Sequence, residues 1–116
     1  MASDFEIELG PSERSESGER CVATVRVPAD LRYLEGHFPG RPIVPGLAQL
    51  SPLVYRLVRR AWPDLPAPSS VKRLRFLEAL GPGDRLEVRL ARDADRVRFE
   101  IVRGELTCSH GVLVFR

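Results

Sequence analysis

The sequence predicts an α+β fold in which an antiparallel β-sheet wraps around one long central helix. Three observations lead to this prediction. Most of the chain consists of short segments with alternating apolar and polar residues, only residues 47–61 have helical periodicity, and turn residues separate the segments. Because strands of this kind bury a single face, the helix is expected to cover that face of the sheet.

The length and charge of the chain limit its organisation. With 116 residues and 43% hydrophobic content, the chain is predicted to form one domain, residues 1–116. The 18 basic and 16 acidic residues give a formal charge of +2, and the basic residues are scattered, which argues against nucleic-acid binding. There is no apolar run near the roughly 20 residues that span a bilayer, and no secretory pattern at the N-terminus. We therefore expect a soluble, cytoplasmic protein with no membrane contact.

The two cysteines predict neither a disulfide framework nor a metal site. Cys21 and Cys108 lie far apart in the sequence, and Cys108 with His110 supplies too few ligands for a structural zinc, which usually takes four. We expect both cysteines to be small strand residues packed as apolar groups, and we expect no bound metal.

The N-terminal quarter predicts a hairpin. Residues 4–9 alternate as a half-buried strand, residues 10–19 are polar turn residues, and residues 20–27 alternate again. The two strands are expected to pair in antiparallel fashion. Asp30 is then placed to cap a short helical turn that ends at Leu34.

Residues 47–61 predict a mostly buried helix. Its apolar residues recur at helical spacing, and they are Leu47, Leu50, Leu53, Val54, Leu57, Val58 and Ala61. The polar positions include Gln49, Ser51 and Tyr55. Pro52 allows two interpretations: one helix from about Gly46 that bends near the proline, or a separate first turn followed by a helix that Ser51 caps with Pro52 at its first position. We expect the first of these.

The C-terminal half predicts four strands. They are expected over residues 69–80, 85–92, 96–103 and 105–115, as a continuous antiparallel meander with tight turns between them. The edge strands and the uncovered side of the helix predict that the chain forms a symmetric dimer.

One loop combines the residues that suggest chemistry. The segment from Gly36 to Gly46 contains His37 followed by three prolines and two glycines, which set a tight path into the start of the helix. A histidine held beside a helix N-terminus suits anion or carbonyl chemistry. The only other histidine, His110, is expected to be an ordinary strand residue.

These residues resemble a known family. Residues 36–46 resemble the His-Phe-Pro-Gly-x-Pro-x-x-Pro-Gly signature of the 3-hydroxyacyl-(acyl-carrier-protein) dehydratases of the hot-dog fold. A second similarity follows in the family's order, with Phe76 in a strand and Gly81 to Leu86 at a Pro-Gly-Asp-x-Leu turn. The resemblance covers residues 20–116, and among these proteins the chain looks closest to the small dehydratase-like proteins of aryl-polyene pathways. It implies a homodimer with the active site at its interface and an acyl chain carried on the phosphopantetheine of an acyl carrier protein, with no other cofactor.

The resemblance also implies roles for individual residues. His37 would remove the C2 proton of a 3-hydroxyacyl thioester, a role that suits imidazole because its unperturbed pKa of about 6.5 lies near working pH, and the backbone N–H of Gly46 would polarise the carbonyl. The acid that assists departure of the hydroxyl matches position 51, where this sequence has Ser51. The residues implied to bind substrate are Phe38, Pro45, Leu47 and Phe76.

Because serine is not a carboxylic acid, three functions are open. The first is a dehydratase of fatty acid or polyene biosynthesis that forms a trans-2-enoyl thioester, with Tyr55 or Glu78 in place of the missing acid. The second is a weak or silent subunit that binds acyl carrier protein or pairs with an active paralogue. The third is an acyl thioesterase.

Basic residues near the helix end suggest a docking site. The acyl carrier proteins that carry this family's substrates are acidic. The candidate residues to bind one are Arg59, Arg60, Lys72, Arg73 and Arg75. A solvated mixed-charge surface is the competing interpretation.

Overall fold

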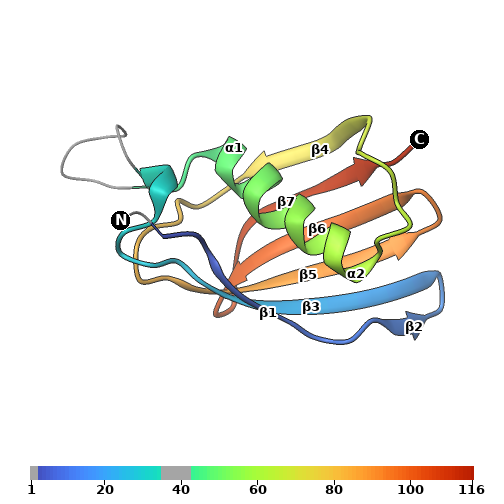
Figure 1. The fold of residues 1–116 in the computed structure, drawn as a ribbon, viewed down its shortest axis with the longest axis horizontal. Helices are drawn as coiled ribbons and strands as arrows, with labels where there is room; N and C mark the ends of the chain where they lie inside the picture. The colour runs from blue at the N-terminus through green and yellow to red at the C-terminus, as the bar shows by residue number, and fades with distance from the viewer. Residues whose placement is uncertain (1–2, 35–42) are drawn as a thin grey trace.

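The computed structural model describes residues 3–34 and 43–116, which form a seven-stranded antiparallel sheet with one helix lying across one face (Figure 1). The α+β prediction is confirmed. Its strands are β1 (Glu6–Leu9), β2 (Glu13–Ser15), β3 (Gly18–Arg26), β4 (Ser70–Phe76), β5 (Arg85–Asp93), β6 (Arg96–Arg103) and β7 (Leu106–Val114).

The order of the strands is β1-β3-β5-β6-β7-β4, with β2 paired to the end of β3. The predicted four-strand meander is therefore wrong, because only β5, β6 and β7 follow one another in the sheet. β4 lies at the edge beside β7, and the chain returns across the sheet to pair β5 with β3. The helix lies between β3 and β4 in the sequence, and the chain after it forms β4 at the far edge of the sheet. The alternation of residues within a strand does not reveal which strand is its neighbour.

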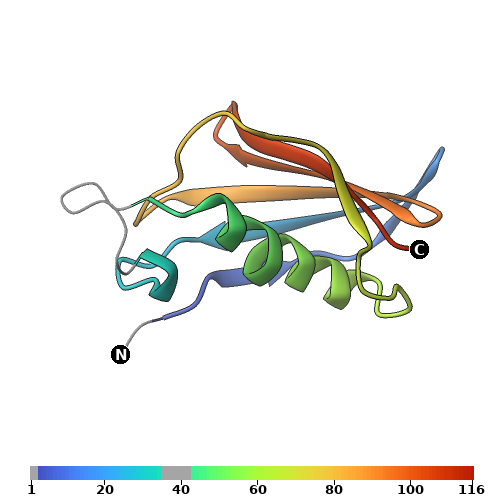
Figure 2. The ribbon, with the colours of Figure 1, turned by 90° about the horizontal axis from the view of Figure 1, so that it is seen from above.

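Alternation in the central strands is confirmed by burial. Along β3, the side chains of Cys21, Ala23 and Val25 are buried while Val22 is 44% exposed, and β5 alternates in the same way. The inward side chains of β3, β5, β6 and β7 pack against the helix residues that are fully buried, which are Leu53, Val54, Leu57 and Val58. Figure 2 shows the consequence: the helix covers one face of the sheet, and no described element covers the other.

One helix runs from Gly46 to Ala61 in three parts, namely α1 (Gly46–Gln49), a π-helical segment (η2, Leu50–Tyr55) and α2 (Arg56–Ala61). The continuous helix was one of the two interpretations of Pro52, and the alternative with Ser51 as an N-cap is wrong because Ser51 lies inside the helix. Proline has no N–H and its ring crowds the carbonyl four residues earlier. The wider π-turn around Pro52 accommodates both effects.

Two N-terminal expectations need correction. The polar turn at residues 10–19 contains the short strand β2, which forms a hairpin with Gly18 to Arg20. The helical turn near Leu34 exists as η1 (Arg32–Leu34), but the Asp30 carboxylate accepts a hydrogen bond from the Ser3 hydroxyl at 2.7 Å. The side chain of Asp30 therefore binds Ser3, just before β1, instead of capping the turn as expected.

Both cysteines are buried and unpaired, as expected of apolar packing. Burial raises the pKa of the Cys21 and Cys108 thiols. Within the described residues, no cluster of three His, Cys, Asp or Glu side chains is arranged to hold a metal ion. None of the helices in that part of the chain is long and apolar enough to cross a membrane.

Candidate active site

The start of the helix is held against the edge strand β4. Pro45 precedes the helix with an extended backbone (φ −60°, ψ 152°), and its carbonyl accepts hydrogen bonds from the N–H groups of Ala48 at 3.0 Å and Gln49 at 3.3 Å. Gly46 is the first helical residue, so its own N–H has no acceptor within the helix. This N–H is a donor at the positive end of a 16-residue helix.

The absence of a side chain at Gly46 permits a close approach. The ring of Phe76 lies so near that a Cβ on Gly46 would fall 2.6 Å from Cε2 and 2.7 Å from Cζ of the ring. Real Cβ atoms essentially never approach that closely. Phe76, at the end of β4, thus forms an aromatic wall beside the helix start.

Val44, just before Pro45, is held by hydrogen bonds at both its N–H and its carbonyl. The N–H of Val44 donates to the carbonyl of Leu80 at 2.7 Å, and the carbonyl of Val44 accepts a weak hydrogen bond from Nε2 of Gln49 at 3.5 Å. Leu80 belongs to the loop after β4, so the same edge of the sheet positions both Val44 and Gly46. The path into the helix is set by these tertiary contacts as well as by Pro45.

Gln49 is a residue that sequence reasoning missed. It was counted among the polar positions of the helix, yet its side chain is only 3% exposed. Its Oε1 has no hydrogen-bond partner in the described structure. The available signal was its spacing, three residues after Gly46, which places both residues on the same side of the helix. A buried amide with an unused acceptor beside the helix start is a second polar feature of the site.

Two of the predicted site residues, His37 and Phe38, lie outside the described residues. Of the others, Pro45 is half-buried and Phe76 is 46% exposed, and both are beside Gly46. Leu47 is 82% exposed, so its place in the predicted buried stripe is wrong. The first helical turn directs Gln49 inward and Leu47 outward, which leaves a large apolar side chain in solvent next to the site.

Ser51 lies apart from the contact between Gly46 and Phe76. Its side chain is exposed and lines a shallow groove of about 410 Å³ along the outer side of the helix. The other lining residues are Tyr55, Arg56, Arg59 and Arg60. Tyr55 thus accompanies Ser51, as the sequence indicated, whereas the exposed Glu78 is not among the residues of this groove. No lining residue of the groove is acidic.

Tyr55 is surrounded by aromatic and basic groups. Its ring lies 6.3 Å from the ring of Phe115, and the guanidinium of Arg59 sits 5.8 Å from its centroid. Cations close to the ring face attract its π-electrons, so the contact holds Arg59 beside Tyr55. The groove is a basic, partly aromatic surface.

The five basic residues predicted to meet a carrier protein do not form one patch. Arg59 and Arg60 line the groove on the helix, while Lys72 and Arg73 line a groove over the opposite face of the sheet. His110 is a strand residue, as expected, and it lies on that opposite face across from Arg75. The chain therefore carries two separate basic surfaces.

Known proteins resemble this chain over most of its length. A family model described as ApeI-like, ApeI dehydratase, matches residues 13–112. The chain is 30% identical over 109 residues to the 3-hydroxyacyl-[acyl-carrier-protein] dehydratase FabZ of Oenococcus oeni, covering 84% of this chain and 78% of that protein. It is 34% identical over 110 residues to FabZ of Legionella pneumophila strain Corby, covering 82% and 73%.

Solved structures resemble the fold. The dehydratase heterocomplex ApeI:P from Xenorhabdus doucetiae superposes with a TM-score of 0.79 at 22% identity over 96% of this chain and 99% of that one. An uncharacterized protein from Erwinia carotovora subsp. atroseptica superposes with a TM-score of 0.81 at 22% identity over 100% and 97%. The predicted hot-dog fold is confirmed. With a family model that matches 100 residues, this chain is a dehydratase that belongs to the ApeI-like family.

Proposed function

We propose that the protein removes water from a 3-hydroxyacyl thioester carried on an acyl carrier protein and forms a trans-2-enoyl thioester. The observation that carries this proposal is the helix start, where the N–H of Gly46, which has no acceptor within the helix, lies beside the ring of Phe76. The similarity to the FabZ dehydratases of Oenococcus oeni and Legionella pneumophila supports the substrate class.

The chemistry requires stabilisation of an enolate. Removal of the C2 proton places negative charge on the thioester oxygen, and an N–H at a helix N-terminus stabilises that charge. The C3–O bond then breaks, the C2=C3 double bond forms, and the hydroxyl leaves with one proton as water. In this proposal His37 takes the C2 proton, Gly46 binds the carbonyl oxygen, and Phe76 and Pro45 flank the acyl chain.

The proton for the leaving hydroxyl needs a source other than a carboxylate at position 51. An imidazolium that has just taken the C2 proton is itself an acid and can return that proton to the hydroxyl. The atoms then balance with one residue acting as base and acid in turn. The phenol of Tyr55, which shares a groove with Ser51, is the second candidate donor.

We also propose that the active form is a dimer. Leu47 at the helix start and Phe76 and Leu77 at the end of β4 are 82%, 46% and 53% exposed, so apolar area at the site is left uncovered by a single chain. A second copy would cover these side chains and bring its own Ser51 groove to the site. The similarity to the dehydratase heterocomplex ApeI:P from Xenorhabdus doucetiae supports the alternative, in which a paralogous subunit takes that place.

The test is incubation of the purified protein with a 3-hydroxyacyl carrier-protein thioester, with water loss followed by mass spectrometry. Turnover that is abolished in His37→Ala supports the dehydratase. No turnover by the parent, with a gain in Ser51→Asp but not in the exposed control Ser70→Asp, supports the silent-subunit alternative. Release of the free acid identifies a thioesterase and contradicts the proposal.

A further inference from the structure

The face of the sheet opposite the helix is hollowed and strongly basic. Two adjoining grooves, of about 650 and 410 Å³, cross strands β3, β5, β6, β7 and β4, and they share Arg73, Ala91, Arg98 and Val112. Seven basic and two acidic side chains line them, a formal charge of +5, whereas the whole chain carries +2. The rest of the molecule is therefore net negative, and positive charge is concentrated on one uncovered face.

Most of these cations lack a counter-charge. Among the described residues, no carboxylate lies within ion-pair distance of Arg20, Arg73 or Arg98. The same holds for Lys72 and Arg96. Guanidinium groups bind carboxylates and phosphates with two parallel hydrogen bonds, so unpaired arginines around a groove provide binding groups for an anionic surface.

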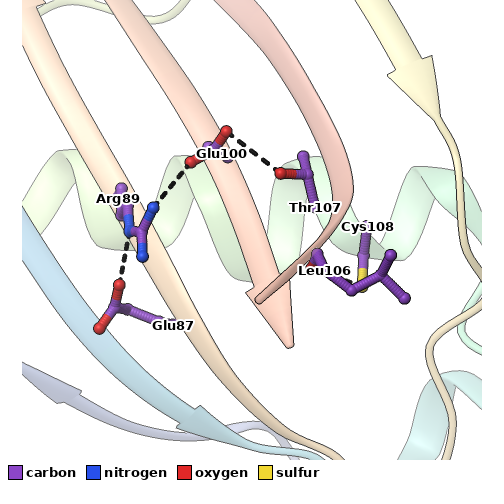
Figure 3. Close-up of polar contacts among 6 residues, drawn as sticks. All are labelled: Glu87, Arg89, Glu100, Leu106, Thr107 and Cys108. Carbon is purple, nitrogen blue, oxygen red and sulfur yellow. Dashed lines mark hydrogen bonds and ion pairs between the residues drawn. The ribbon is translucent and has the colours of Figure 1, made fainter. Parts of the chain in front are cut away.

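One arginine of the groove is held in place by the sheet itself. Figure 3 shows the guanidinium of Arg89 between the carboxylates of Glu87, at 2.5 Å, and Glu100, at 3.2 Å. Glu100 also accepts a hydrogen bond from the hydroxyl of Thr107 at 3.4 Å. These ion pairs raise the pKa of Arg89. The only acidic side chain of the larger groove is thus already occupied by Arg89 and Thr107 and does not neutralise the unpaired arginines.

Arg73 has an unusual backbone that directs it to this face. Its φ is 53°, and the register between β4 and β7 is interrupted between Lys72 and Arg75. A bulge of this kind re-aims a side chain, and a positive φ disfavours residues with a Cβ. The outcome is that Arg73 lines both grooves at the point where they meet.

The occupant that these features fit is an acidic protein. Like charges oppose contact between two copies of this face. The grooves are open and charged over five strands, unlike the enclosed, mostly apolar sites of small ligands. Their exposed apolar residue Val22, together with Val112, provides the dry contact area found at the centre of protein interfaces.

We propose that this outer face is the docking surface for the acyl carrier protein, an inference that rests on the proposed function for the identity of its partner. The position of β4 connects the two surfaces. Phe76 contacts Gly46 on the helix side, while the adjacent Arg75 pairs with His110 on the outer side. Arg73, which lines both grooves, lies three residues before Phe76 on β4, or about 10 Å along the strand. A carrier protein docked over the grooves is therefore on the opposite face of β4 from the helix start, and because β4 is an edge strand, a flexible phosphopantetheine arm can pass around it.

The test compares two pairs of charge reversals by titration of fluorescently labelled acyl carrier protein, followed by anisotropy at low salt. Arg73→Glu with Arg98→Glu is expected to weaken binding about tenfold or more. Arg85→Glu is the control for a charge reversal elsewhere on the sheet, and it is compared with Arg73→Glu alone, because Arg85 is exposed on β5 outside both grooves and has no ion pair among the described residues. Binding that is lost only in Arg59→Glu with Arg60→Glu places the docking surface on the helix and overturns the proposal.

A kinetic measurement separates this inference from the proposed function. With a short pantetheine thioester, which has no carrier protein, the Arg73→Glu/Arg98→Glu variant is expected to turn over within about twofold of the parent. With the carrier-linked substrate, its KM is expected to rise. If the parent protein turns over neither substrate, the proposed function is contradicted. The anisotropy titration then still tests whether the outer face binds the carrier protein. If light scattering shows that the parent is a dimer and that the Arg73→Glu/Arg98→Glu variant is a monomer, the outer face binds a second copy of the chain. That result overturns the proposal.

Discussion

The ring of Phe76 lies so close to the backbone of Gly46 that any side chain at position 46 would have to displace it. The two residues are 30 positions apart, and each belongs to one of the motifs that the sequence analysis identified. Their contact brings the helix start and the end of β4 into one site. Adding a single methyl group at position 46 is therefore expected to disturb the site.

Gly46→Ala is expected to displace the Phe76 ring and to lower turnover more than stability. Overpacking of this kind costs about 1–3 kcal/mol in a closed core, and the partial exposure of Phe76 places the cost at the lower end. Thermal unfolding and turnover measure the two effects. The double variant Gly46→Ala/Phe76→Leu is expected to recover most of the lost stability, and additive losses would contradict the contact.

Gln49→Leu is expected to change stability by about 1 kcal/mol or less while lowering turnover. The substitution removes a weak hydrogen bond to Val44, but it also removes a buried acceptor with no partner in the described structure, and these effects oppose each other. Urea unfolding and steady-state kinetics separate the two. A large loss of stability with normal turnover would show that Gln49 serves only to fix the loop.

Pro52→Ala is expected to keep or raise the free energy of unfolding and to reduce activity. Alanine restores a backbone donor, so the π-helical segment can relax to a regular α-helix. Each residue gained or lost in a helix rotates the first turn by about 100°, which would reorient Gly46 and Gln49 relative to Phe76. Circular dichroism during urea unfolding and the dehydration assay give the two readouts. Unchanged activity would show that the π-turn does not set the site.

The two buried thiols predict a loss of stability at high pH. Burial raises their pKa in the folded state, so the folded protein holds these protons more tightly than the unfolded chain. Their contribution is fully present below the ordinary thiol pKa of about 8.5 and is lost as the pH rises through the raised folded values. Unfolding free energies between pH 7 and pH 10 should fall less steeply in Cys21→Ala/Cys108→Ala. Equal slopes would contradict the assignment.

The sequence predicted the parts of this fold that depend on local periodicity. Alternation located β3, β5, β6 and β7 to within about two residues, and helical spacing located the helix from about Gly46. It did not predict that β4 pairs with β7, because alternation shows which face of a strand is buried and carries no information about its neighbour. It also missed β2, which is short and polar and forms only because β3 extends beyond β1.

In the candidate site too, the sequence predicted what depends on local patterns and missed what depends on tertiary packing. The motif indicated Pro45 and Gly46, and helix spacing placed Tyr55 beside Ser51. The burial of Gln49 and the exposure of Leu47 depend on how the helix is rotated over the sheet, and the π-turn at Pro52 changes that rotation after the first turn. Spacing on a regular helix cannot predict such a change.

The bulge in β4 couples the two surfaces of the molecule through register. Side chains alternate along a strand, so a slip of one residue in the pairing with β7 would exchange the faces to which Arg75 and Phe76 belong. The aromatic ring would leave the helix start, and the charge of Arg75 would leave the outer face, where it lies opposite His110. Insertions or deletions between Lys72 and Arg75 are therefore expected to damage the site and the outer surface together, whereas substitutions can alter either one alone.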